Sequence, residues 1–120
     1  MTNDKKMEWV LRIGVIGEFL GHGLLAIGGK TDWVKWVSQM INVEASTATT
    51  LLLLIGIFDL IVAAIVLFKP VQPILLWATF WGFWTALVRP LVGVGWLDFI
   101  ERFANWGAPL ALYYFYRSRK

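Results

Sequence analysis

The stretch from Leu51 to Phe68 constrains this chain more than any other part of its sequence. It contains 18 consecutive residues with a single charged side chain, Asp59. A helix needs about 20 predominantly apolar residues to cross the hydrocarbon core of a bilayer, which is about 30 Å thick. A helix also satisfies its backbone hydrogen bonds within the segment, which lipid requires. The stretch therefore predicts a transmembrane helix over about residues 46–68.

The composition of the whole chain points the same way. Hydrophobic residues make up 58% and charged residues 16%, against about 45–50% and about 25% in soluble domains. The absence of cysteine excludes a disulfide framework and thiol chemistry. The net charge of +3 comes from basic residues clustered near the two chain ends, which suits anionic lipid and cytoplasmic loops. We therefore expect an integral membrane protein with lipid, and no nucleic acid, as its partner.

Three further segments have the character of membrane spans, and a shorter one is amphipathic. The predicted spans are about residues 7–28, 46–68, 73–89 and 99–116. Residues 33–41 repeat apolar side chains at three- and four-residue spacing, as an amphipathic helix does. This segment is too short to cross a bilayer, so we expect it to lie in the membrane interface. The alternative is a helix packed on the bundle. Asp98 and Glu101 have the spacing of a capping box, which predicts the start of the last span.

These segments predict an all-α fold, an integral membrane bundle of four transmembrane helices with a short interfacial helix between spans one and two. We expect residues 1–120 to form a single membrane domain. Four spans place both termini on one side, and the basic residues there assign that side to the cytoplasm. We expect no cleaved signal peptide, because the first span carries charged residues and lacks a small-residue cleavage site.

The first predicted span carries Glu18 and the only histidine, His22. The two are four residues apart and so share one face of a helix. A charged group costs roughly 2.5–3.5 kcal/mol at the centre of a membrane helix, so groups from other spans must face it. Gly14, Gly17 and Gly21 lie on or beside this face, and small residues at such spacing let another helix approach closely. We therefore expect these glycines to be helix-packing residues.

The predicted topology brings the scattered polar residues to similar depths. The candidate ligand-binding or proton-relay residues are Glu18, His22, Asp59, Arg89, Glu101, Arg102, Asn105, Trp77, Trp81, Trp84 and Trp106. The residues expected to ring the outer mouth of the bundle are His22, Arg89, Glu101, Arg102 and Asn105. Glu18 and Asp59 would lie deeper, and the tryptophans would wall the space between. Each residue type also has a structural interpretation, as a register-fixing pair, a headgroup contact, a helix cap or a packing residue. Their convergence favours a functional site.

These residue types limit the chemistry of the site. A histidine with two carboxylates from only two helices is a poor metal site, and we assign no metal ligand. A haem with two axial histidines is excluded within one protomer, and we name no catalytic nucleophile. A relay through Glu18 and His22 to a bound quinone or small polar ligand is chemically reasonable, because histidine titrates near neutral pH. Arg89 would then hold an anionic or carbonyl oxygen. Quinone is the candidate cofactor.

The same residues resemble a known family. Arg12, the run Gly17-Glu-Phe-Leu-Gly-His22-Gly, Asp59 and the closing Glu101-Arg-Phe-Ala-Asn105-Trp-Gly-Ala-Pro109 are similar to patterns of the DoxX-like membrane proteins. The resemblance covers most of the chain and implies a four-helix bundle, here expected in a bacterial cytoplasmic (inner) membrane. Members include a subunit of a thiosulfate:quinone oxidoreductase, membrane partners of redox-defence enzymes, and animal endoplasmic-reticulum proteins that assist receptor assembly.

The resemblance therefore implies a redox context without fixing one activity. We expect a small membrane subunit of a quinone-linked redox system, with a ligand cavity in the outer half of the bundle and a redox partner protein. The alternative is a non-enzymatic binding or assembly factor that docks a client or a second copy through the glycine face of the first span. A third interpretation, a small permease, would require a dimer and has no inverted repeat to support it.

Overall fold

The computed structural model describes residues 2–119, and all the regular structure in this range is helical. The helices are α1 (Asn3–Ile27), α2 (Thr31–Ile41), α3 (Ala45–Phe68), α4 (Gln72–Leu91), α5 (Trp96–Ile100) and α6 (Ala104–Arg117). The predicted all-α fold is confirmed. Helices α1, α3 and α4 match the first three predicted spans, and each is long and apolar enough to cross a membrane.

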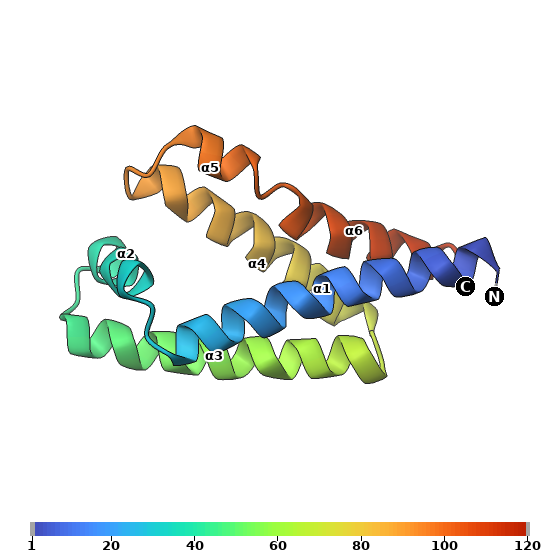
Figure 1. Cartoon of the computed structure of the whole chain (residues 1–120), viewed down its shortest axis with the longest axis horizontal. Helices are drawn as coiled ribbons and strands as arrows, with labels where there is room; N and C mark the ends of the chain where they lie inside the picture. Colours follow the sequence, from blue (N-terminus) through green and yellow to red (C-terminus); the bar gives the residue numbers. More distant parts are fainter. Residues whose placement is uncertain (1, 120) are drawn as a thin grey trace.

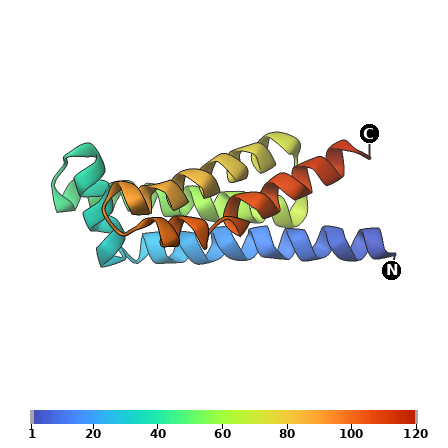
Figure 2. The same cartoon turned by 90° about the horizontal axis from the view of Figure 1, so that it is seen from above.

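The long helices run antiparallel along an elongated molecule of 50 × 27 × 20 Å. Helix α1 packs mainly on α3, while α4 packs on α5 and α6. Helix α2 lies across one end, which we call the α2 end (Figure 1). Helix α1 begins and α6 ends at the opposite end, which we call the terminal end (Figures 1 and 2). The two helix pairs meet near the terminal end and diverge toward the α2 end (Figure 1).

The last predicted span is not one continuous helix. In place of a helix over residues 99–116, the chain forms α5 and α6, separated by turns at residues 101–103. Asp98 lies inside α5 and no side chain caps α6, so the capping box predicted at Asp98 and Glu101 is wrong. Among the described residues only α1, α3 and α4 have the length and hydropathy of membrane spans. A fourth crossing therefore stays a prediction.

Two residues shape the backbone beside this break. Pro109 has no N–H to donate to the carbonyl of Asn105, four residues earlier, so the regular helix bond is missing there. That carbonyl lies against α4, where a Cβ atom added to Gly82 would be only 2.2 Å from its oxygen. Nothing larger than glycine fits this contact. The backbone at the start of α6 therefore packs directly on the backbone of α4 at Gly82, where there is no side chain between them.

A second close contact joins α1 to α3, at glycines other than those predicted. A Cβ atom on Gly23 would lie 2.9 Å from the carbonyl oxygen of Gly56, and one on Gly56 would lie 2.7 Å from that of Gly23. By contrast, no atom lies within 4 Å of a Cβ added at Gly14, Gly17 or Gly21. These three glycines do not pack on another helix within the described part of the chain. Their face of α1 is exposed.

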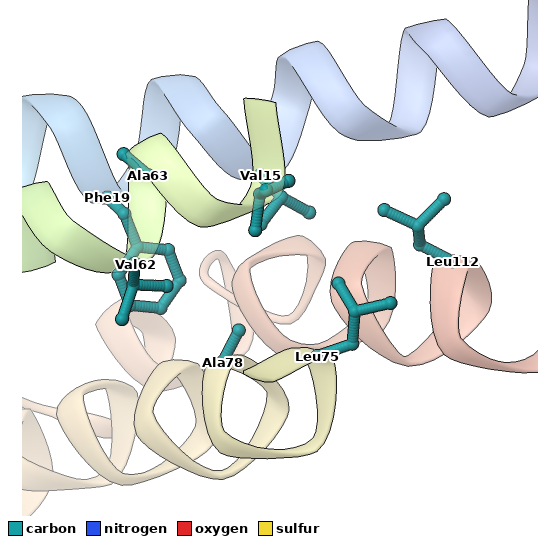
Figure 3. Packing of buried hydrophobic residues seen from close by; sticks show 8 residues of the cluster. Val15, Phe19, Val62, Ala63, Leu75, Ala78 and Leu112 are labelled. Atoms are coloured by element: carbon teal, nitrogen blue, oxygen red, sulfur yellow. The ribbon is translucent and has the colours of Figure 1, made fainter. Parts of the chain in front are cut away.

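The hydrophobic core occupies the terminal half of the bundle. Its buried side chains come from all four long segments, and they are Val15, Phe19, Val62, Ala63, Val66, Leu75, Ala78 and Leu112 (Figure 3). Most are completely excluded from solvent. Burying a side chain of the size of Val, Leu or Phe contributes about 1.5–3 kcal/mol. This layer holds the four segments together and separates the terminal end from everything nearer to α2.

Polar groups at the terminal end are satisfied by one another. Arg12 donates from Nε to the carbonyl of Val66, at 3.1 Å, and from Nη2 to the carbonyl of Leu67. These are among the last carbonyls of α3, which have no partner within their own helix. The Glu8 carboxylate lies 3.5 Å from Arg12 and accepts a 2.6 Å hydrogen bond from the Tyr116 hydroxyl. The Arg12 cluster (Glu8, Arg12 and Tyr116) thus ties α1 to α3 and α6.

Candidate ligand site

A cavity of about 300 Å³ lies between α1, α3 and α4, on the α2 side of the hydrophobic core. Helix α2 closes one wall of it with the apolar face predicted from its residue spacing. The polar and tryptophan side chains that line the cavity are His22, Asp59, Thr85, Arg89, Trp33, Trp36, Trp81 and Trp84. The remaining lining residues are aliphatic or methionine. A mostly apolar pocket with a few convergent polar groups is typical of a small-molecule site.

The polar groups lie at opposite ends of the cavity. Along α3 the lining runs from Leu51 to Asp59, and along the antiparallel α4 it runs from Trp81 to Arg89. Eight residues of helix span about 12 Å at 1.5 Å per residue. Asp59 and Trp81 therefore lie at the deep end, next to the hydrophobic core. Arg89 lies at the outer end, next to α2.

Arg89 is buried without an acidic partner. Its exposed fraction is 4%, so it does not extend to a membrane surface as one interpretation of the sequence required. It donates to the carbonyl of Thr85, and its guanidinium carbon lies 5.0 Å from the centre of the Trp36 ring. Its Nε atom is buried with no hydrogen-bond partner. No carboxylate within residues 2–119 comes within 4.0 Å of it.

Two carboxyl groups within the apolar helices α1 and α3 are also incompletely paired. Asp59 is 3% exposed, and its Oδ1 atom is buried with no partner. The Oε2 atom of Glu18 is likewise buried with no hydrogen-bond partner. The two carboxyls lie close enough for the charge of one to act on the other, but Glu18 does not line the cavity. Neither forms an ion pair with an arginine, so the register-fixing interpretation has no support among the described contacts.

The histidine lies on the cavity wall. His22 packs edge-on against Trp33, with 5.5 Å between ring centres. The positive charges of Arg89, Arg102 and Lys30 all act on it. His22 thus joins α1 to α2 at the cavity, one helical turn beyond Glu18 in the direction of the α2 end.

The structure brings some of the predicted site residues together and not others. His22, Asp59, Arg89, Trp81 and Trp84 line the cavity. The other candidates lie outside it, and they are Glu18, Trp77, Glu101, Arg102, Asn105 and Trp106. Trp77 stacks on Trp81 with 5.5 Å between ring centres, and Trp106 belongs to an aromatic cluster with Phe83 and Phe103. Arg102 and Glu101 lie close enough to Arg89 for their charges to act on it but do not line the cavity, so the single polar ring predicted at the outer mouth stays a prediction.

Helix α2 was not predicted from the sequence to be part of the site. Residues 33–41 were expected to lie in the membrane interface, but Trp33 and Trp36 of this segment line the cavity. This agrees with the alternative of a helix packed on the bundle, and the position of α2 relative to a membrane stays a prediction. The sequence shows that this segment has an apolar face, but it does not show what that face packs against. The signal in the sequence for this role of α2 was a pair of tryptophans on a helix too short to cross a membrane.

Comparisons with known proteins add no relative. No protein-family model matches the chain, and no curated protein or solved structure is significantly similar to it. The likeness to DoxX-like proteins therefore rests on the short motifs of the sequence alone, and any function has to be argued from the cavity.

Proposed function

We propose that this chain is a small membrane subunit of a quinone-linked redox system and that its cavity binds the quinone ring. One observation carries the proposal. The cavity combines tryptophan walls with unpaired polar groups of opposite character at its two ends, Arg89 and Asp59. Intramembrane ionisable residues of this kind mark ligand and proton pathways by default. Flat tryptophan surfaces suit a planar ring.

A quinone has an oxygen at each side of its ring, and the cavity has a polar group at each end. Arg89 would donate hydrogen bonds to one oxygen, as a guanidinium does to carbonyl and anionic oxygens. Reduction to the quinol takes up two electrons and two protons. His22 and Asp59 face the ring and would transfer protons to its oxygens. The electrons would come from a partner protein that carries its own redox cofactor.

The membrane arrangement belongs to the same proposal. We place α5 and α6 together as the fourth crossing, because they return beside α4 to the terminal end. We place the terminal end, with Lys5, Lys6, Arg117 and Arg119, in the cytoplasm of a bacterium. The cavity then lies in the outer half of the membrane, separated from the cytoplasmic side by the hydrophobic core.

The test is binding of a short-chain quinone to the protein purified in detergent, followed by quenching of tryptophan fluorescence. His22→Ala and Asp59→Asn should each weaken binding by about tenfold or more, because each removes a polar contact worth about 1.4 kcal/mol. Ile55→Phe should weaken it by filling the cavity. Trp96→Phe is the matched control, because Trp96 is 63% exposed and lies outside the cavity. Unchanged affinity in all three cavity variants would contradict the proposal.

A second candidate function is supported by the exposed glycines of α1. Gly14, Gly17 and Gly21 leave an open, small-residue face with nothing within 4 Å. Such a face lets another membrane helix approach closely, which suits an assembly factor that docks a client or a second copy. Gly17→Leu should disrupt such a complex while quinone binding survives. Because this position has no internal neighbour, the substitution should not disturb the fold.

A further inference from the structure

We propose that the ligand of the cavity is a planar organic anion and that Arg89 holds its ionised oxygen. This rests on the proposed function, because it assumes that the cavity binds a ring, and it then specifies the charge of that ring. Within the quinones, it selects hydroxylated quinones, which ionise near neutral pH, over neutral alkyl quinones.

Arg89 carries a buried charge that forms no ion pair within residues 2–119. A guanidinium stays protonated in proteins and has five N–H groups to donate. Arg89 uses one known bond, to the carbonyl of Thr85 in its own helix, and a contact with the Trp36 ring. Its Nε has no acceptor and its exposed fraction is 4%. Burying a charge is costly unless it is paired and hydrogen-bonded. The missing partner of Arg89 is therefore an anion.

Nearby charges do not remove this requirement. Arg102 lies close enough to Arg89 for the two positive charges to act on each other, and its own Nε is buried without a partner. Asp98 and Glu101 also act on Arg89, but neither forms an ion pair with it among the described contacts. Arg89 therefore has like and opposite charges near it, but no carboxylate among the described residues pairs with it directly.

The shape of the cavity identifies what carries the anion. Arg89 lies on the cavity wall, so an anion bound to it is continuous with whatever fills the space between the tryptophans. The Trp36 ring lies beside Arg89, and Trp84 lines the same cavity. The cavity volume of about 300 Å³ is at the small end for ligand pockets. Such a volume suits one or two fused rings without a long tail. The chemistry that fits both features is a planar ring with an ionised oxygen at one edge.

Three probes of nearly equal shape test the charge. They are 2-hydroxy-1,4-naphthoquinone, which is an anion at neutral pH, and its neutral 2-amino and 2-methyl counterparts. Binding is measured by tryptophan quenching with the full chain in uncharged detergent. The hydroxy compound should bind at least about tenfold more tightly than either neutral probe, since a charge-assisted bond is about twice as strong as a neutral one. This comparison needs only the native protein.

Variants then assign the preference to Arg89. Arg89→Gln should abolish the preference for the anion, and Arg89→Lys should retain part of it. Lys35→Gln is the matched control, because it removes an exposed positive charge of α2 that does not line the cavity. If the preference survives Arg89→Gln, or disappears in Lys35→Gln, the assignment is wrong.

The outcomes separate this inference from the proposed function. Equal binding of all three probes would overturn the anion site and leave the quinone cavity in place. No binding of any probe would overturn both.

Discussion

Arg12 and Arg89 lie in opposite halves of one bundle and are almost equally buried, at 8% and 4% exposed. Arg12 has a carboxylate and two helix-end carbonyls within reach, and its guanidinium also lies 4.1 Å from the centre of the Trp9 ring. Arg89 has one carbonyl of its own helix, a tryptophan face and a cavity. The protein therefore satisfies the charge and hydrogen-bond donors of Arg12 and leaves those of Arg89 partly unsatisfied.

The difference teaches how to interpret a charged residue in an apolar helix. An unpaired buried charge is expensive, so a chain keeps it either as part of an internal network or for a group that arrives from outside. The Arg12 cluster is the first case, and it fastens the terminal end. The cavity is the second, with unpartnered atoms on Asp59 and Arg89. The same residue type thus stabilises one end and is available for binding at the other.

The largest expected effect is on the terminal end. Arg12→Leu leaves the buried Glu8 carboxylate without its arginine and two carbonyls of α3 without a donor. Breaking a buried pair in this way costs about 3–5 kcal/mol. We expect that loss in the free energy of unfolding, measured by denaturant titration in detergent with circular dichroism. A loss below about 1 kcal/mol would mean that the Arg12 cluster does not fasten the bundle.

The next largest effect is expected at the close contact between α4 and the start of α6. Gly82→Ala places a Cβ atom 2.2 Å from the Asn105 carbonyl oxygen, so the backbone must move. Overpacking of this kind costs about 1–3 kcal/mol. Gly17→Ala is the matched control on an open helix face, where alanine should be neutral or stabilising by up to about 1 kcal/mol. The same unfolding titration measures both, and equal effects would contradict the contact at Gly82.

A smaller effect sharpens the role of the cluster. Tyr116→Phe removes only the hydroxyl that donates to Glu8, at 2.6 Å, and keeps the ring in place. We expect it to lower the free energy of unfolding by about 1–2 kcal/mol, as for a hydrogen bond to a charged group. In an Arg12→Leu background the loss should differ, because both residues share Glu8. Additive losses would show that they act independently.

The smallest effect on stability is expected at the other arginine. Arg89→Leu removes a buried charge that pairs directly with no carboxylate among the described residues. Keeping a buried charge unpaired is costly, so its removal should be neutral or stabilising. The free energy of unfolding should therefore fall by less than about 1 kcal/mol, while binding of an anionic ring is lost. A loss as large as that of Arg12→Leu would erase the distinction between the two ends.

Much of the fold could be predicted from the sequence because it depends on local pattern. The run from Leu51 to Phe68 and its two neighbours have the length and apolarity of spans, and α1, α3 and α4 follow them closely. The break between α5 and α6 could not be predicted in this way. The missing N–H of Pro109 is visible in the sequence, but the accommodation of the Asn105 carbonyl depends on Gly82 in another helix.

The candidate site divides in a similar manner. His22, Asp59 and Arg89 were predicted because ionisable residues in apolar spans are conspicuous, and they do meet at one cavity. The two carbonyls that accept from Arg12 are 54 and 55 residues away in the sequence, so nothing local showed that α3 would satisfy this arginine. Which part of the molecule would cover Trp33 and Trp36 likewise depended on the whole fold.

The most direct test of the anion site at Arg89 is a high-resolution density map of the protein with 2-hydroxy-1,4-naphthoquinone bound. We predict ring density between Trp36 and Trp84, with an oxygen within hydrogen-bond distance of the Arg89 guanidinium. A map with the cavity empty, or with the ring bound elsewhere, would contradict the account.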